Sequence, residues 1–203
     1  MPTPVLPKQP AESQFWEWFK QNDDRLFDFE GNQEPLIREI VTELHRIHRS
    51  LSFEISSIKD GKREFIISAD GVRDAFPAVV RLADASPNLA RWDVIKFRPR
   101  RSEPCMVGIG GMDFSSEDVQ FTLKQEGGKI GVTLYLGDSK DFNEEVVGYI
   151  GFLLLDYTLG EYDVETLVGS VQFEPRDNPS KETKRFLPEL PASFDSLVKS
   201  SAS

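Results

Sequence analysis

The sequence is poor in the residues that most often build a redox centre or a metal cage. Its 203 residues include one cysteine, Cys105, and two histidines, His45 and His48. A single cysteine excludes an internal disulfide, a paired-cysteine redox motif and a zinc cage made of cysteines. Low cysteine content is typical of proteins that stay in a reducing compartment, so we expect a cytoplasmic location.

Long apolar runs are missing as well. No segment approaches the roughly twenty apolar residues that span a bilayer. Prolines interrupt the first ten residues, MPTPVLPKQP, where a signal peptide needs a continuous apolar stretch. We therefore expect neither a membrane partner nor export by a signal of this kind.

The familiar catalytic motifs are also absent from the sequence. It contains no G-x-S-x-G elbow, no H-E-x-x-H and no kinase motif set. The stretch VGIGGMDF, residues 107–114, lacks the lysine of a P-loop and is followed by a strand pattern, so it predicts a turn. Cys105 is a minor candidate nucleophile, because both histidines lie on a distant predicted helix. We expect no cofactor and assign no catalytic residue.

Negative charge is present, and it is concentrated in one part of the chain. The net charge is −10; residues 1–101 carry 16 acidic and 16 basic side chains, whereas residues 102–175 carry 14 acidic and 3 basic ones. A field of this sign repels phosphate, which argues against nucleic acid and anionic lipid as partners. The acidic segment instead favours a cation or a basic partner protein.

The spacing of apolar residues predicts an α+β fold, with a mostly antiparallel sheet and helices packed on it in two layers. We expect residues 1–10 to form a flexible tail, residues 11–175 a single domain, and residues 176–203 a partly ordered C-terminal extension. Helices are predicted in residues 13–27, 35–49, 73–85 and 142–159. Strands are predicted in residues 51–58, 63–69, 92–101, 118–124, 129–137 and 161–173, with tight turns at DGK and QEGG.

Two helical patterns have both a functional and a structural interpretation. The aromatic stripe FWEWF, residues 15–19, is typical of a binding surface or of a helix docked on a core, and the core is favoured. His45 and His48 have a spacing that could hold a metal, but their neighbours Arg46 and Arg49 would repel a cation. We therefore assign no metal ligand.

The stretch FLLLDYTLGEYDVETLVGSVQF, residues 152–173, places carboxylates between two apolar runs. If residues 161–165 are extended, Glu161, Asp163 and Glu165 point to one face. We call these three residues the acidic triplet. Alternate carboxylates would then be roughly 6.5–7 Å apart along the strand. Their repulsion needs relief from a metal, a basic partner, or the protein's own basic segment. That segment comprises Arg98, Arg100 and Arg101.

Three hypotheses follow from this cluster. The leading one is a non-enzymatic interaction or regulatory module whose acidic surface, the acidic triplet with Asp156 nearby, receives a basic partner protein. The alternative is a protein that binds a metal or small cation, or a hydrolase, through the same carboxylates, although no D-x-D-x-D-G loop is present. The third is structural: the acidic triplet neutralises the basic segment inside the fold.

Several segments occur in an order that carries a family resemblance: FWEWF, LSFEIS, REFIISADG, RWDVIKFRPR, DVQFTL and LLLDYTLGEYDVET. With its FWxWF, SADG and LGEYxVE-like motifs, the chain resembles a family of uncharacterised bacterial domains, known mainly as a domain of unknown function, over about residues 12–174. The resemblance implies a small cytosolic α+β protein and transfers no catalytic residue. By analogy of fold alone, such acidic proteins include immunity and regulatory partners of other proteins.

Overall fold

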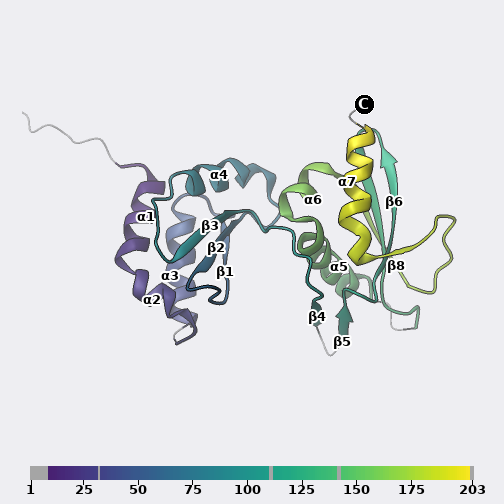
Figure 1. Ribbon diagram of the computed structural model, residues 1–203, viewed down its shortest axis with the longest axis horizontal. Coiled ribbons are helices and arrows are strands. Elements are labelled where there is room, and N and C mark those ends of the chain that lie inside the picture. Colours follow the sequence, from purple (N-terminus) through teal and green to yellow (C-terminus); the bar gives the residue numbers. More distant parts are fainter. Residues whose placement is uncertain (1–8, 32, 110–111, 141–142, 202–203) are drawn as a thin grey trace, which may run out of the picture. The chain divides into compact units, whose positions relative to one another are not determined.

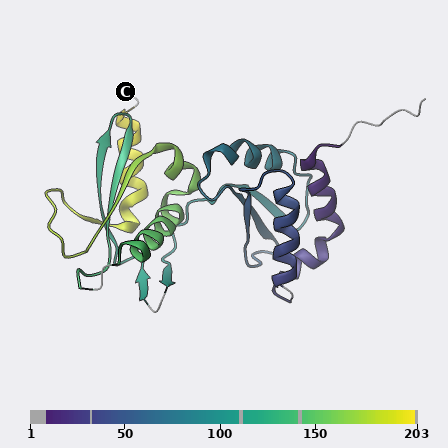
Figure 2. The same ribbon diagram turned by 180° about the vertical axis from the view of Figure 1, so that it is seen from behind.

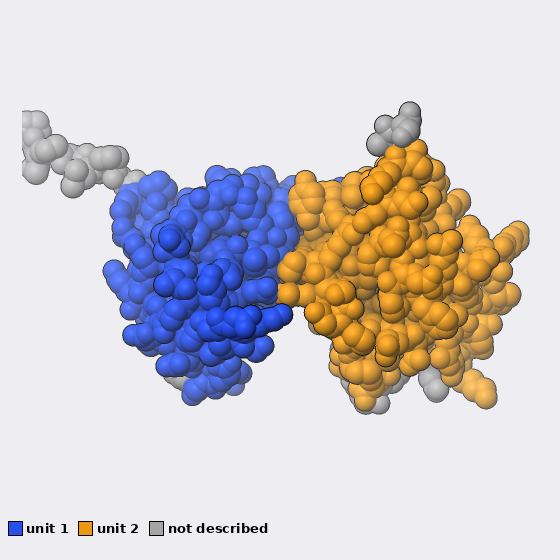
Figure 3. Space-filling view, viewed as in Figure 1, with its two compact units in different colours: residues 1–97 blue, residues 98–203 orange. Residues whose placement is uncertain are grey.

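Apolar side chains gather in two separate clusters, one before and one after residue 97. The computed structural model describes residues 9–31, 33–109, 112–140 and 143–201. It divides into two compact units, Met1–Phe97 (unit 1) and Arg98–Ser203 (unit 2), which are coloured separately in Figure 3. The fold is α+β, as predicted, but each unit has its own core where the sequence predicted one domain across residues 11–175.

Unit 1 is a small sheet with helices packed against it (Figure 1). The strand order is β1-β2-β3; β2 is antiparallel to β1 and parallel to β3, with α4 in the crossover. The predicted hairpin is present, with Asp60 and Gly61 at positive φ in its turn. The elements are α1 (Ala11–Gln21), α2 (Asp23–Phe27), η1 (Phe29–Gly31), α3 (Gln33–His45), β1 (Ser52–Ile55), β2 (Arg63–Ser68), η2 (Arg73–Ala75), α4 (Phe76–Asp84) and β3 (Trp92–Lys96).

The aromatic stripe of α1 belongs to the core of unit 1. Phe15, Trp16 and Phe19 are buried, and the Trp16 indole N–H donates to the carbonyl oxygen of Leu82 at 2.8 Å. The stripe therefore docks the helix, as the favoured interpretation predicted. The helix begins at Ala11 rather than at Ser13, and it ends at Gln21, so the predicted helix over residues 13–27 is two helices.

Unit 2 is built on a four-stranded sheet of order β8-β7-β6-β9. The β6–β7 and β6–β9 pairs are antiparallel and β7–β8 is parallel, with α5 and α6 in the crossover. Figure 1 shows α7 in front of this sheet and Figure 2 shows it behind. The elements are β4 (Met106–Ile109), β5 (Met112–Ser115), β6 (Gln120–Glu126), β7 (Lys129–Tyr135), α5 (Glu144–Leu159), α6 (Glu161–Leu167), β8 (Val168–Glu174), β9 (Arg185–Phe186), η3 (Leu187–Glu189) and α7 (Leu190–Ser201).

The core of unit 2 lies between the sheet and two helices. Ile150 and Leu154 of α5, and Phe194 of α7, share one buried cluster with inward side chains of β6 and β7. The predicted C-terminal extension is therefore part of this unit, because Leu187 and Phe194 are fully or almost fully buried. No described helix is long and apolar enough to cross a membrane.

Three local differences from the sequence prediction have physical reasons. Residues 161–167 form α6 instead of a strand, because Gly160 at φ 79° redirects the chain and two acidic residues favour the N-terminus of a new helix. The stretch VGIGGMDF, predicted to be a turn, contributes residues to the antiparallel strands β4 and β5, and its residues 110–111 lie outside the described residues. His48 lies beyond α3, which ends at His45.

The surroundings of two glycines of α5, Gly148 and Gly151, predict opposite effects of substitution to alanine. A Cβ at Gly151 would overlap the ring of Phe173, whereas a Cβ at Gly148 would meet that ring at an ordinary 3.8 Å. Gly151→Ala is expected to lower the free energy of unfolding by about 1–3 kcal/mol through overpacking. Gly148→Ala is expected to raise it by about 0.5–1 kcal/mol through helix propensity. Urea unfolding followed by circular dichroism measures both, and equal signs would contradict the packing at Phe173.

Candidate functional site

The acidic triplet does not form a single row of carboxylates, because it begins α6 instead of a strand. On a helix, residues four apart are neighbours and residues two apart point in different directions. Glu161 and Glu165 therefore share one side of α6, and Asp163 lies on another. The prediction that residues 161–165 are extended, with their carboxylates in one row, is therefore wrong.

Glu161 is an interior residue. Its side chain has 0% relative exposure, and its Oε2 accepts a hydrogen bond from the backbone N–H of Arg98 at 3.2 Å. In return the backbone N–H of Glu161 donates to the carbonyl oxygen of Arg98 at 3.0 Å. A residue buried in this way fixes the basic segment against the start of α6 and offers no surface to a partner.

Gly160 permits this close approach. A Cβ at position 160 would lie 3.2 Å from both the carbonyl oxygen of Arg98 and the amide nitrogen of Arg100. The backbone N–H of Arg101 also donates to the carbonyl oxygen of Tyr157 at 2.8 Å. The basic segment thus runs along the junction of α5 and α6 and binds it through the backbone.

Arg100 is the centre of an ionic network in unit 2. Its guanidinium donates to the carbonyl oxygen of Leu159 at 2.8 Å, to Asp163 Oδ2 at 2.6 Å, and to the two carboxylate oxygens of Asp195 at 2.9 and 3.1 Å. The hydrogen bonds that Arg100 donates to Asp195 raise the pKa of Arg100 against the opposing effect of burial, and the bond to Asp163 adds to the rise. Asp163 is therefore engaged in joining α6, α7 and the basic segment.

Substitution of Arg100 is expected to destabilise unit 2. Arg100→Gln would leave Asp163 and Asp195 near each other without their shared cation. Because Arg100 is 32% exposed, solvent screening limits the loss to about 1–2 kcal/mol of unfolding free energy. Asp195→Asn in the same chain should recover part of the loss, as measured by urea unfolding.

The matched control for Arg100 is Arg176, whose exposed pair with Asp138 has an N–O distance of 3.2 Å. Arg176→Gln is expected to change the unfolding free energy by less than about 0.5 kcal/mol. An equal effect of the two substitutions would contradict a structural role for the Arg100 network.

One face of α5 is exposed and combines aromatic side chains with carboxylates. Tyr149, Phe152 and Leu153 are 57%, 49% and 39% exposed. Glu145, which is exposed, precedes them by one helical turn, and Asp156, which is half-buried, follows them by one turn. We call these five residues the acidic aromatic face.

The segment of sequence that contains this face has no basic residue. The sequence contains no lysine or arginine from residue 141 to residue 175, a stretch that includes all of α5, α6 and β8. Exposed aromatic groups are normal singly, but three large apolar side chains at adjoining helical positions form a patch of the kind found at protein interfaces. Sequence reasoning missed this patch because α5 is apolar around most of its circumference.

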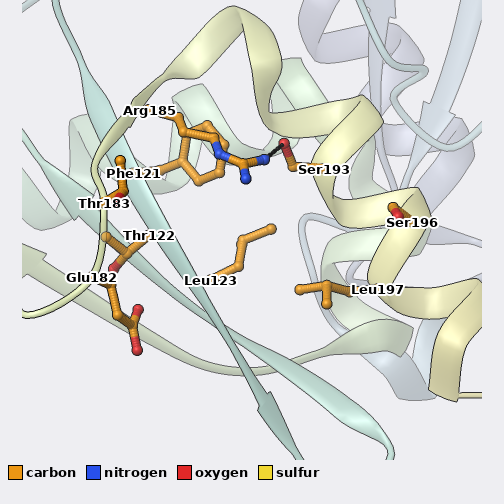
Figure 4. A pocket seen from close by; sticks show the side chains of 9 residues that line it. All are labelled: Phe121, Thr122, Leu123, Glu182, Thr183, Arg185, Ser193, Ser196 and Leu197. Atoms are coloured by element: carbon orange, nitrogen blue, oxygen red, sulfur yellow. Dashed lines mark hydrogen bonds between the residues drawn. The ribbon is translucent and has the colours of Figure 1, made fainter.

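Two of the hollows of unit 2 lie beside its four-stranded sheet. One, of about 320 Å³, lies on the polar face of the sheet. Glu126 Oε2 accepts from Ser170 Oγ at 2.8 Å there, over the space left by Gly131. Tyr135, which lines the same hollow, has the ammonium of Lys184 3.9 Å from its ring centroid. These polar groups therefore interact largely with one another. The other hollow, of about 300 Å³, lies between β6 and α7 (Figure 4).

The remaining candidates are divided between the two units. His45 and His48 belong to unit 1 and Cys105 to unit 2. Among the described residues, no group of three or more histidine, cysteine, aspartate or glutamate side chains is placed to hold a metal ion.

The chain matches no family model, no curated protein and no solved structure. The family resemblance therefore stays a prediction, and function is inferred from the chemistry of unit 2.

Proposed function

We propose that the protein is a non-enzymatic interaction or regulatory module, and that the acidic aromatic face of α5 receives a basic partner protein. The observation that carries this proposal is the exposure of Tyr149, Phe152 and Leu153 between the carboxylates of Glu145 and Asp156. The apolar centre would supply affinity by burial. The carboxylates would speed and select association with a cationic surface.

The proposal changes the roles of the residues singled out from the sequence. Asp156 lies on the acidic aromatic face and remains a candidate for partner binding. Glu161 and Asp163 hold the fold through the basic segment. Glu165, which is half-buried on α6, stays a candidate for partner binding. For the alternative of a metal-binding protein or hydrolase, the described part of the chain shows no group of three or more carboxylate, histidine or cysteine side chains that could hold a metal ion.

Loss of large apolar side chains from the acidic aromatic face is expected to weaken partner capture. The experiment is a crosslinked pull-down from native cells at low and high salt, followed by a titration with the purified partner. Tyr149→Ala combined with Leu153→Ala should weaken binding at least tenfold, a loss of about 1.4 kcal/mol or more. Glu145→Lys should mainly slow association and reduce its dependence on salt.

Two control variants distinguish binding by the acidic aromatic face from general effects of surface charge and hydrophobicity. Glu117→Lys makes the same charge change at an exposed site elsewhere in unit 2, and Ile58→Ala removes an exposed apolar side chain of unit 1. Both should bind as the wild type does. A partner that binds independently of salt, or equally well to all four variants, would overturn the proposal.

A further inference from the structure

One edge of the sheet in unit 2 is open for most of its length. Strand β6 pairs with β7 along all of Gln120–Glu126, but on its other side β9 pairs only with Gln120 and Phe121. Within the described ranges no other strand pairs with that side. An edge of this kind is a template for an added strand.

The backbone of Leu123 faces this edge. The carbonyl oxygen of Val119 accepts from the N–H of Leu187 at 2.9 Å, which places Val119 on the β9 side of the strand. Backbone groups alternate in direction along a strand, so Phe121 and Leu123 face the same side. The N–H and carbonyl of Leu123 are therefore directed at the position that an additional strand would occupy.

The hollow of about 300 Å³ lies beside the open edge. Leu123 and Phe121 of β6 and Leu197 of α7 supply its apolar side chains, as Figure 4 shows. Arg185, which is paired with Phe121 across the β6–β9 ladder, donates from its guanidinium to Ser193 Oγ at 2.9 Å. An added strand would direct every second side chain toward this hollow.

The position of β9 determines where an added strand must end. A segment that runs antiparallel to β6, as β9 does, would approach Arg185 with its carboxyl end. Beyond that point β9 occupies the edge. A chain that ends there would present its terminal carboxylate to the Arg185 guanidinium, whose planar donors suit a carboxylate. Glu182, on the same hollow, would disfavour acidic side chains earlier in the segment.

We infer that the open edge of β6 binds the C-terminus of an extended peptide as an added antiparallel strand. The peptide backbone pairs with Leu123, a large apolar side chain near its end enters the hollow, and its terminal carboxylate pairs with Arg185. This is binding by strand addition combined with carboxylate capture. It involves none of the residues of the acidic aromatic face and does not depend on the proposed function.

The test uses the full chain and a defined probe, the fluorescein-labelled peptide Lys-Ser-Thr-Val-Thr-Leu, in fluorescence anisotropy titrations. The free carboxylate should bind saturably, and the C-terminal amide should bind at least tenfold more weakly. Arg185→Gln should remove that difference. N-methylation of a single peptide bond should abolish binding when it falls at one of the alternate positions whose N–H groups point at β6. At the positions between them, N-methylation should leave binding intact.

A blocking variant and its matched control complete the test. Ser196 lines the hollow on α7, and Ser200 lies one turn further along the same helix outside the hollow. Ser196→Trp should abolish peptide binding while Ser200→Trp preserves it, and circular dichroism should show both folded. The inference is overturned if no probe saturates by about 1 mM, if carboxylate and amide bind equally, or if N-methylation acts without alternation.

Discussion

Glu161→Lys is expected to lower the unfolding free energy of unit 2 by about 3–5 kcal/mol, the loss typical of breaking a buried charged contact. The wild-type carboxylate is fully buried and accepts from the backbone of Arg98. A lysine in its place would bury a second cation beside the basic segment and leave that N–H without its acceptor. The contact lies where the chain enters unit 2, so the damage should spread through this unit.

The distribution of aromatic residues makes the effect on each unit measurable. All three tryptophans, Trp16, Trp18 and Trp92, lie in unit 1. Tryptophan emission therefore reports unit 1, whereas circular dichroism reports both units. Glu161→Lys should move the unfolding transition followed by circular dichroism to a lower urea concentration. The transition followed by tryptophan emission should stay near its wild-type midpoint.

Two further variants test the same prediction if the Glu161→Lys variant does not fold. Glu161→Gln keeps the shape and one acceptor, and is expected to cost about 1–2 kcal/mol. Glu165→Lys makes the same charge change at a half-buried position one turn later, and should cost less than about 1 kcal/mol. Equal losses at positions 161 and 165 would contradict the interior role of Glu161.

Local turn chemistry and helical periodicity explain which elements could be predicted from the sequence. Asp60 and Gly61 adopt positive φ in the first hairpin, and Gly127 and Gly128 do so between β6 and β7. These residue types determine a tight turn with little help from the rest of the fold. The end of α5 at Gly160 was predictable for the same reason.

Long-range packing explains the parts that could not be predicted. Alternating apolar residues after Gly160 are compatible with a strand, and the docking of Glu161 on Arg98, which the sequence does not reveal, adds to the local signals that favour the helix. The division into two cores depends on which apolar faces meet, which composition does not reveal. The parallel β2–β3 pair also needs a crossover helix, and no local signal identifies such a partner.

The candidate site was predictable in its chemistry and not in its geometry. The excess of acidic residues pointed to the part of the chain that carries the candidate site, and an internal ion pair, such as that between Arg100 and Asp163, was among the alternatives. The identity of the exposed residues was hidden, because Leu153 and Leu154 are equally apolar in sequence and only one is buried. The open edge of β6 has no sequence signal, since it depends on where β9 ends.

Phe19→Ala is expected to lower the unfolding free energy of unit 1 by about 3–5 kcal/mol through loss of apolar burial and formation of a cavity. Phe19 is fully buried, and its ring lies 5.0, 5.1 and 5.3 Å from the ring centroids of Phe65, Trp92 and Trp16. These edge-to-face contacts join α1 to the sheet, so their loss should loosen the attachment of the helix. The measurement is urea unfolding followed by tryptophan emission, since two of the contacting rings are tryptophans.

The control for Phe19→Ala is Lys20→Ala, at the next position on the exposed side of α1. It is expected to change the unfolding free energy by less than about 0.5 kcal/mol. If Phe19→Ala instead left stability unchanged and removed binding of a partner, the FWEWF stripe would be a binding surface and the core position of α1 would be wrong. A stability loss at Phe19 with partner capture by α5 intact would instead separate the two roles, with the aromatic residues of α1 holding unit 1 together and those of α5 facing the partner.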